Sequence, residues 1–61
     1  MTFIVTLPHL GATFYLKGTI WTSALARAQV YQTSAEAQVA LDKAKRFMKA
    51  AQRNLAKIEV N

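Results

Sequence analysis

The stretch that decides the fold is "TSAEAQVALDKAKRFMKAAQRNL", residues 33–55. It opens with Thr-Ser-Ala-Glu, the pattern of a capping box. In such a box the Thr33 hydroxyl accepts a hydrogen bond from the Glu36 amide, and the Glu36 carboxylate reaches back to the Thr33 amide. Glu36 also places a negative charge at the positive end of the helix dipole. We therefore expect a helix to begin at Thr33.

Apolar side chains recur along this stretch at alternating steps of four and three residues, which is the spacing of one helix face. They are Ala37, Leu41, Ala44, Met48, Ala51 and Leu55, with Ala40 and Phe47 beside them. One continuous stripe predicts one long amphipathic helix of about five turns. Asn54 is an acceptable C-terminal stop.

Two stretches before the helix alternate with the period of two that is typical of half-buried strands. They are residues 2–7 and 13–17. Between them, Pro8 cannot donate to a ladder and Gly11 frees the backbone to reverse, so "PHLGA" predicts a hairpin connection of moderate length. Gly18 ends the second strand. The side chains expected to face the helix are Phe3, Val5, Leu7, Phe14 and Leu16.

The segment "TIWTSALARAQVYQT", residues 19–33, supports two readings. Its Ala, Leu, Arg and Gln residues favour a helix, although only by tenths of a kcal/mol each. Its alternation favours a strand, which we prefer, with a helix as the alternative. The strand's inward face would hold Ala24, Ala26, Ala28 and Val30.

The C-terminal "LAKIEV" alternates again and predicts a short fourth strand, with a frayed helix end as the alternative. The order is then β-β-β-α-β. We expect one domain over residues 1–61, of the α+β class. It would be a small two-layer structure in which a three- to four-stranded, mostly antiparallel sheet packs on one long amphipathic helix.

The stretch "ARAQVYQTSAEAQVALDKAKRF", residues 26–47, runs from a strand ending in an aromatic residue through Thr/Ser-x-x-Glu-Ala into an Ala-rich basic helix. In this it resembles small accessory proteins encoded by bacteriophages and prophages. The resemblance covers about a third of the chain. It implies a compact factor that binds and modulates a host protein or a nucleic acid.

Side chains that could carry catalysis or hold a metal are few and scattered. The chain has no Cys, and its single histidine, His9, has no ligand partner near it in sequence. The carboxylates of Glu36, Asp42 and Glu59 are not spaced as a catalytic pair. We therefore expect no enzyme, no metal and no cofactor. The lack of Cys, of a recognisable leader and of a long apolar span favours a cytoplasmic protein without membrane contact.

The charge balance favours an anionic partner. The net charge is +5 and the pI about 10.1, which attracts nucleic acid or acidic protein surfaces. On the predicted helix the cations that fall within an arc of about 100°, opposite the apolar stripe, are Lys45, Arg46, Lys49 and Arg53. Only Asp42 interrupts them. A solvated face that has no ligand is the first interpretation of this pattern, and a contact with nucleic acid or another polyanion, or with an acidic protein, is the alternative.

The uncovered face of the predicted sheet is the second candidate surface. It would carry Tyr15, Lys17, Trp21, Leu25, Arg27 and Tyr31. Tyr, Trp and Arg anchor protein interfaces, and aromatic residues among cations can also stack single-stranded bases. Our leading hypothesis is a non-catalytic binding protein that modulates an acidic host protein by direct contact. The alternative is a nucleic-acid-binding protein that uses the basic helix face.

A homodimer is a third use of that sheet face. A chain of 61 residues buries little of its surface, and this one has neither a disulfide nor a metal to stabilise it.

Overall fold

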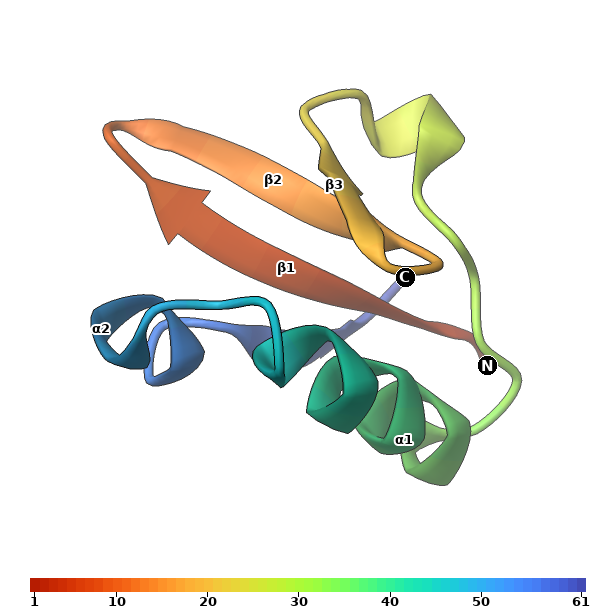
Figure 1. Ribbon diagram of the computed structural model, residues 1–61. Coiled ribbons are helices and arrows are strands. Elements are labelled where there is room, and N and C mark those ends of the chain that lie inside the picture. Colours follow the sequence, from red (N-terminus) through yellow and green to blue (C-terminus); the bar gives the residue numbers. More distant parts are fainter.

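A four-stranded antiparallel sheet and a helical layer make up the structure, a computed structural model that describes all 61 residues (Figure 1). The strands are β1 (Phe3–His9), β2 (Ala12–Lys17), β3 (Ile20–Thr22) and β4 (Lys57–Val60). The helical elements are the 3-10 turn η1 (Leu25–Arg27), α1 (Ser34–Lys45) and α2 (Ala50–Arg53). The sheet order is β3-β2-β1-β4. The predicted α+β class and β-β-β-α-β order are confirmed.

The hairpin between β1 and β2 is tighter than the sequence suggested. His9 pairs with Ala12, so the turn has only two residues. Leu10 and Gly11 both have positive φ, 50° and 78°, as a type I′ hairpin turn requires. Pro8 lies within β1 rather than in the turn. It is tolerated there because β4 pairs with β1 only as far as Thr6, which leaves an open edge beside the proline.

The predicted strand over residues 24–31 is wrong. The third strand is the shorter β3, and residues 25–27 form η1, in which no residue is buried. Within the segment only Tyr31 forms a β-bridge: its backbone N and O lie 2.8 and 2.9 Å from the O and N of Phe3. Of the residues expected to face the helix, Ala24, Ala26 and Val30 are exposed and Ala28 is half-buried.

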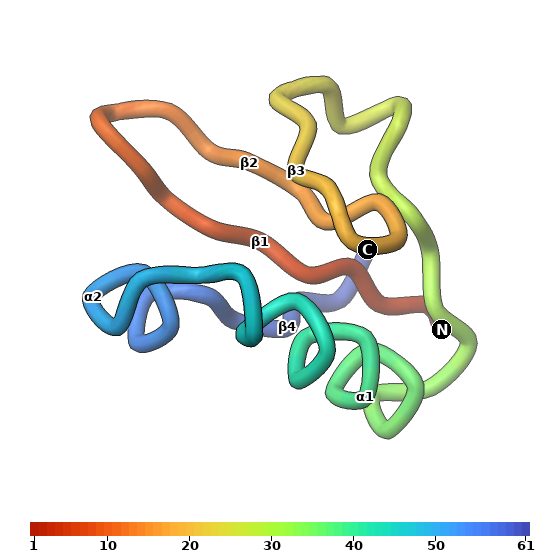
Figure 2. Tube along the Cα trace, viewed as in Figure 1, coloured from red at the N-terminus to blue at the C-terminus, as the bar shows by residue number.

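The course of the chain explains this difference. Residues 23–32 must carry it from the β3 edge to the start of α1, which lies beside the N-terminal end of β1 (Figure 2). A strand paired along β3 would not reach that point. Two hydrogen bonds hold this connecting segment to the sheet instead. The Gln29 backbone N donates to the Leu16 O at 3.1 Å, and the Gly18 N donates to the Gln29 side-chain Oε1 at 2.9 Å.

The helix begins where the capping box predicts but ends early. The Thr33 Oγ1 accepts from the Glu36 N at 3.1 Å, whereas the Glu36 carboxylate accepts from the Gln32 N at 3.2 Å rather than from Thr33. α1 ends at Lys45, and α2 is a separate single turn. The predicted continuous helix of five turns is therefore wrong.

The pairing of β4 accounts for the break between α1 and α2. A straight helix over residues 34–55 would be about 33 Å long at 1.5 Å per residue, whereas the longest extent of the molecule is 28 Å. α1 runs away from the Phe3 end of β1, yet β4 must start beside Thr6 and run back to Phe3. The chain must therefore turn back soon after Lys45.

The core lies between α1 and one face of the sheet. Its buried members are Val5, Leu7, Leu16, Tyr31, Ala37, Leu41, Ala44 and Met48. Ala51 and Leu55, the last residues of the predicted stripe, are exposed because the helix has already broken. No helix in the structure has both the length and the apolar character needed to cross a bilayer.

Candidate functional site

The predicted aromatic surface is not a single surface. In an antiparallel pair, directly opposed residues share a face. Trp21 opposes Leu16, a fully buried core residue, so Trp21 lies on the helix side of the sheet. Tyr31 is buried, with 7% of its surface exposed. The expectation that both project away from the helix is wrong.

The other four members of that set are also divided. Tyr15 is half-buried and Lys17 is exposed, and both lie on the far face, opposite to Leu16. Leu25 and Arg27 are exposed in η1, outside the sheet. The far face therefore lacks the cluster of aromatic anchors on which the expected docking surface depended.

The predicted basic residues gather where α1 gives way to α2. Arg46 caps the C-terminus of α1 and Lys49 is the N-cap of α2. The Arg53 Nε donates to the Met48 carbonyl at 3.2 Å, which fixes its guanidinium across the break. Lys45 lies one residue before this turn. We call Lys45, Arg46, Lys49 and Arg53 the basic surface.

Acidic residues neutralise little of the basic surface. Asp42 lies 3.9 Å from the Lys45 Nζ and also accepts from the Gln38 side chain at 2.9 Å. Glu59 pairs with Lys57 at 3.7 Å, and Glu36 is held in the cap. These are all the carboxylate side chains of the chain. Arg46, Lys49 and Arg53 therefore keep their charge without an acidic partner, and their field attracts anions.

Phe47 stands among these cations and is 78% exposed. On the continuous helix that the sequence predicted, it would lie beside the apolar stripe. In the structure the backbone turns at residues 46–48 through hydrogen bonds of the 3-10 type, such as Phe47 N to Ala44 O at 3.0 Å. Met48 is thereby buried, and Phe47 is left at the surface between Arg46 and Lys49.

An aromatic groove lies next to the basic surface. α1 stops before the hairpin end of the sheet, and α2 lies beneath that end (Figure 1). A groove of about 170 Å³ lies between α2 and the sheet. Its lining residues are Leu7, His9, Phe14, Trp21 and Gln52. The rings of His9 and Phe14 meet edge to face, with centroids 6.2 Å apart. All three aromatic residues of the groove are only half-buried.

Sequence reasoning missed this groove because the face of Trp21 depends on register. Lys17 pairs with Ile20, so the turn between β2 and β3 has two residues. Gly18 takes the first position with a φ of 64°, which suits a type II′ turn. A two-residue turn at "GT" places Trp21 opposite Leu16. Gly18 and Thr19 were therefore the sequence signal from which the face of Trp21 could have been predicted.

The chemistry that this end offers is charge attraction and stacking. Nowhere in the structure do three or more His, Asp or Glu side chains lie close enough together to hold a metal ion. Aromatic faces beside unpaired cations suit a flat, anionic partner. No protein-family model, curated protein or solved structure matches this chain.

Proposed function

We propose that this chain is a non-catalytic nucleic-acid-binding protein that holds a single strand. The phosphates lie on the basic surface, and one or more bases stack on the rings of the aromatic groove. One observation carries the proposal: α2 belongs to both features. Its Gln52 lines the groove, while Lys49 and Arg53 stand at its two ends.

A single strand fits this arrangement better than a duplex. Bases in a duplex are already stacked on each other, whereas unpaired bases can stack on protein rings, and each such contact contributes about 1–3 kcal/mol. The groove of about 170 Å³ is smaller than pockets that enclose a whole ligand. Stacking on a half-buried ring needs only an open face. Phosphate contacts carry no sequence information, so we expect weak sequence preference.

The proposal predicts how strongly the binding constant depends on salt concentration. For single strands the logarithm of the binding constant falls with a slope of about 0.7 per phosphate contact. Four contacts, one for each cation of the basic surface, give a slope of about 2.8. Raising the salt from 50 to 200 mM then lowers the affinity by about fiftyfold.

The test is a titration of fluorescein-labelled oligothymidylate, followed by anisotropy across that salt range. The double variant Lys49→Gln with Arg53→Gln should bind more weakly, and its slope should fall to about 1.4. A matched control, Lys17→Gln with Arg27→Gln, removes two charges outside the basic surface and should keep most of the slope.

The single tryptophan adds a second readout. Trp21 fluorescence should change with oligothymidylate and should stay constant with polyphosphate, which has charge but no bases. If oligothymidylate does not bind at 50 mM salt, or if the control pair weakens binding as much as the Lys49/Arg53 pair, the proposal is wrong. Capture of an acidic host protein by the wild type but not by the Lys49/Arg53 variant would return attention to the first hypothesis.

A further inference from the structure

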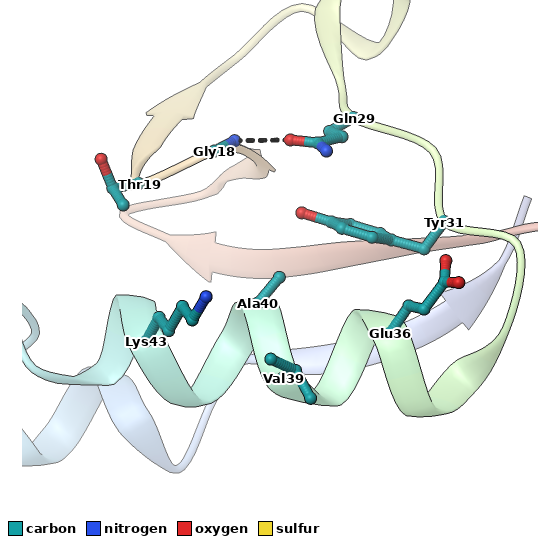
Figure 3. Close-up of a pocket in the computed structure, with 8 residues that line it drawn as sticks. All are labelled: Gly18, Thr19, Gln29, Tyr31, Glu36, Val39, Ala40 and Lys43. Carbon is teal, nitrogen blue, oxygen red and sulfur yellow. Dashed lines mark hydrogen bonds between the residues drawn. The ribbon is translucent and has the colours of Figure 1, made fainter.

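A second pocket, separate from the groove and the basic surface, lies between α1 and the turn that joins β2 to β3 (Figure 3). Its volume is about 470 Å³, within the range of small-molecule sites. Besides that turn, it is lined by Gln29, Tyr31, Glu36, Val39, Ala40 and Lys43.

The Tyr31 hydroxyl is the unusual group in this pocket. Two backbone bonds to Phe3 anchor the residue, and its side chain is buried. The hydroxyl oxygen is shielded from solvent and has no hydrogen-bond partner. Buried polar atoms in proteins nearly always have one. In Figure 3 the hydroxyl points toward the Gln29 and Lys43 side of the pocket and away from Glu36.

The groups on that side are donors. The Gln29 Oε1 accepts from the Gly18 amide, so the Gln29 amide nitrogen remains free to donate. Lys43 takes part in no ion pair. A tyrosine hydroxyl carries its proton at neutral pH, and burial raises the pKa of Tyr31 further, so this hydroxyl can donate. These three donors on one side of the pocket call for a ligand rich in acceptors.

The charges of the pocket indicate which acceptor. Lys43 and Glu36 line it two helical turns apart, about 10 Å along the axis. Lys43 carries the only positive charge of the lining, and Glu36 at the other end repels additional negative charge, so a monoanion is favoured over a doubly charged phosphate. Val39 and Ala40 lie between them, and the Val39 side chain is 54% exposed. An apolar ligand body can cover this patch.

We propose that this pocket binds a small organic monocarboxylate. Its carboxylate accepts from the Gln29 amide and the Lys43 ammonium and, once the lining side chains shift to uncover that atom, from the Tyr31 hydroxyl. Its apolar body lies on Val39 and Ala40. Lys43 is not part of the basic surface. The pocket shares no lining residue with the groove or the basic surface, so we expect the two sites to bind separately.

The probe is phenylacetate, titrated into ¹⁵N-labelled protein and followed by amide chemical shifts. We expect saturable shifts at Gly18, Gln29 and Val39. Phenylacetamide has the same ring without the charge and should produce none. Tyr31→Phe should bind phenylacetate at least about tenfold more weakly, because a hydrogen bond to a charged group is lost. Its melting temperature should not fall, because the hydroxyl has no partner in the folded protein.

Lys43→Gln provides a second variant that keeps the core intact, and it should also bind at least about tenfold more weakly. Lys17→Gln removes a charge on the far face of the sheet and should bind as the wild type does. The two pocket variants, Tyr31→Phe and Lys43→Gln, should bind oligothymidylate with little change. Failure of the carboxylate proposal is therefore distinguishable from failure of the proposed function.

Several results would overturn the proposal. They are the absence of shifts with phenylacetate, equal shifts with phenylacetamide, tighter binding of inorganic phosphate, and unchanged binding by Tyr31→Phe, which would leave the hydroxyl to water. N-acetylaspartate amide carries the carboxylate on a peptide unit. If it binds as tightly as phenylacetate, the carboxylate belongs to a protein partner and the small-molecule assignment is wrong.

Discussion

The two ends of the helix-covered sheet face differ in how completely they are closed. At the end covered by α1, Val5 and Ala37 are fully buried and Leu41 is nearly so. Toward the hairpin end, only the single turn of α2 lies over the sheet, and Phe14 and Trp21 are half-exposed in the groove there, which the Trp21 side chain reaches from its position opposite Leu16. The same strands supply both ends. The closed end stabilises the fold, and the open end leaves apolar surface exposed, where we propose that the nucleic-acid bases stack.

The largest expected effect is on the closed end. Leu41→Ala removes a side chain that is 3% exposed, and such changes cost about 2–5 kcal/mol. A domain this small has a comparable total stability, so we expect the variant to be largely unfolded at room temperature. Circular dichroism with urea titration measures this. A loss under about 1 kcal/mol would mean that α1 does not close this end.

Trp21→Leu makes the matching change at the open end. Because Trp21 is half-buried, we expect a stability loss of about 1 kcal/mol. Affinity for oligothymidylate should fall by about five- to 150-fold, which corresponds to one stacking contact of about 1–3 kcal/mol. Anisotropy and urea titration on the same variant separate the two effects. Reduced stability with unchanged affinity would place the bases elsewhere.

The hairpin turn next to the open end offers a smaller, stabilising change. Leu10 has a φ of 50°, a region that costs most residues about 1–2 kcal/mol. Asn tolerates this region, and Asn-Gly is a preferred type I′ pair. Leu10→Asn should therefore raise the free energy of unfolding by about 1 kcal/mol and leave nucleic-acid affinity unchanged. A destabilised variant would argue that Leu10, although 91% exposed, makes a needed contact.

The smallest effect is on pH dependence at the closed end. The folded state raises the pKa of Tyr31, so the folded chain holds that proton more tightly than the unfolded chain does. This contribution is fully present below pH about 10, the value for unfolded tyrosine, and is lost as the pH rises through the folded pKa. Urea titrations above pH 10 should show a steeper decline for the wild type than for Tyr31→Phe. Equal slopes would mean that the phenol is not desolvated.

Local sequence patterns predicted the elements that they describe. The constraints that pairing between distant segments places on the path of the chain were not visible in the sequence. The capping box placed the start of α1, and period-two alternation located β1, β2 and β4. The segment at residues 24–31 misled because its alternation consists largely of Ala, which has little preference for either side of a sheet. Its path is set by the distance between the β3 edge and the start of α1.

The candidate site was predicted only in part. The four cations of the basic surface were grouped from the spacing of one continuous helix, whereas in the structure they lie around the break between α1 and α2 and not on a single helix face. The break that exposes Phe47 could not be read from residues 33–55, because it follows from β4 having to pair with β1. Trp21 reached the groove through the two-residue turn at Gly18, where a shift of one residue would have reversed its face.

The most direct test of the account is an amide chemical-shift map of oligothymidylate binding to the wild-type protein. We predict that the perturbed residues cluster at the open end, around Phe14, Trp21, Lys49 and Gln52, while Val5, Ala37 and Leu41 at the closed end stay unchanged. Perturbations centred on η1 or on the far face of the sheet, or none at all at 50 mM salt, would contradict it.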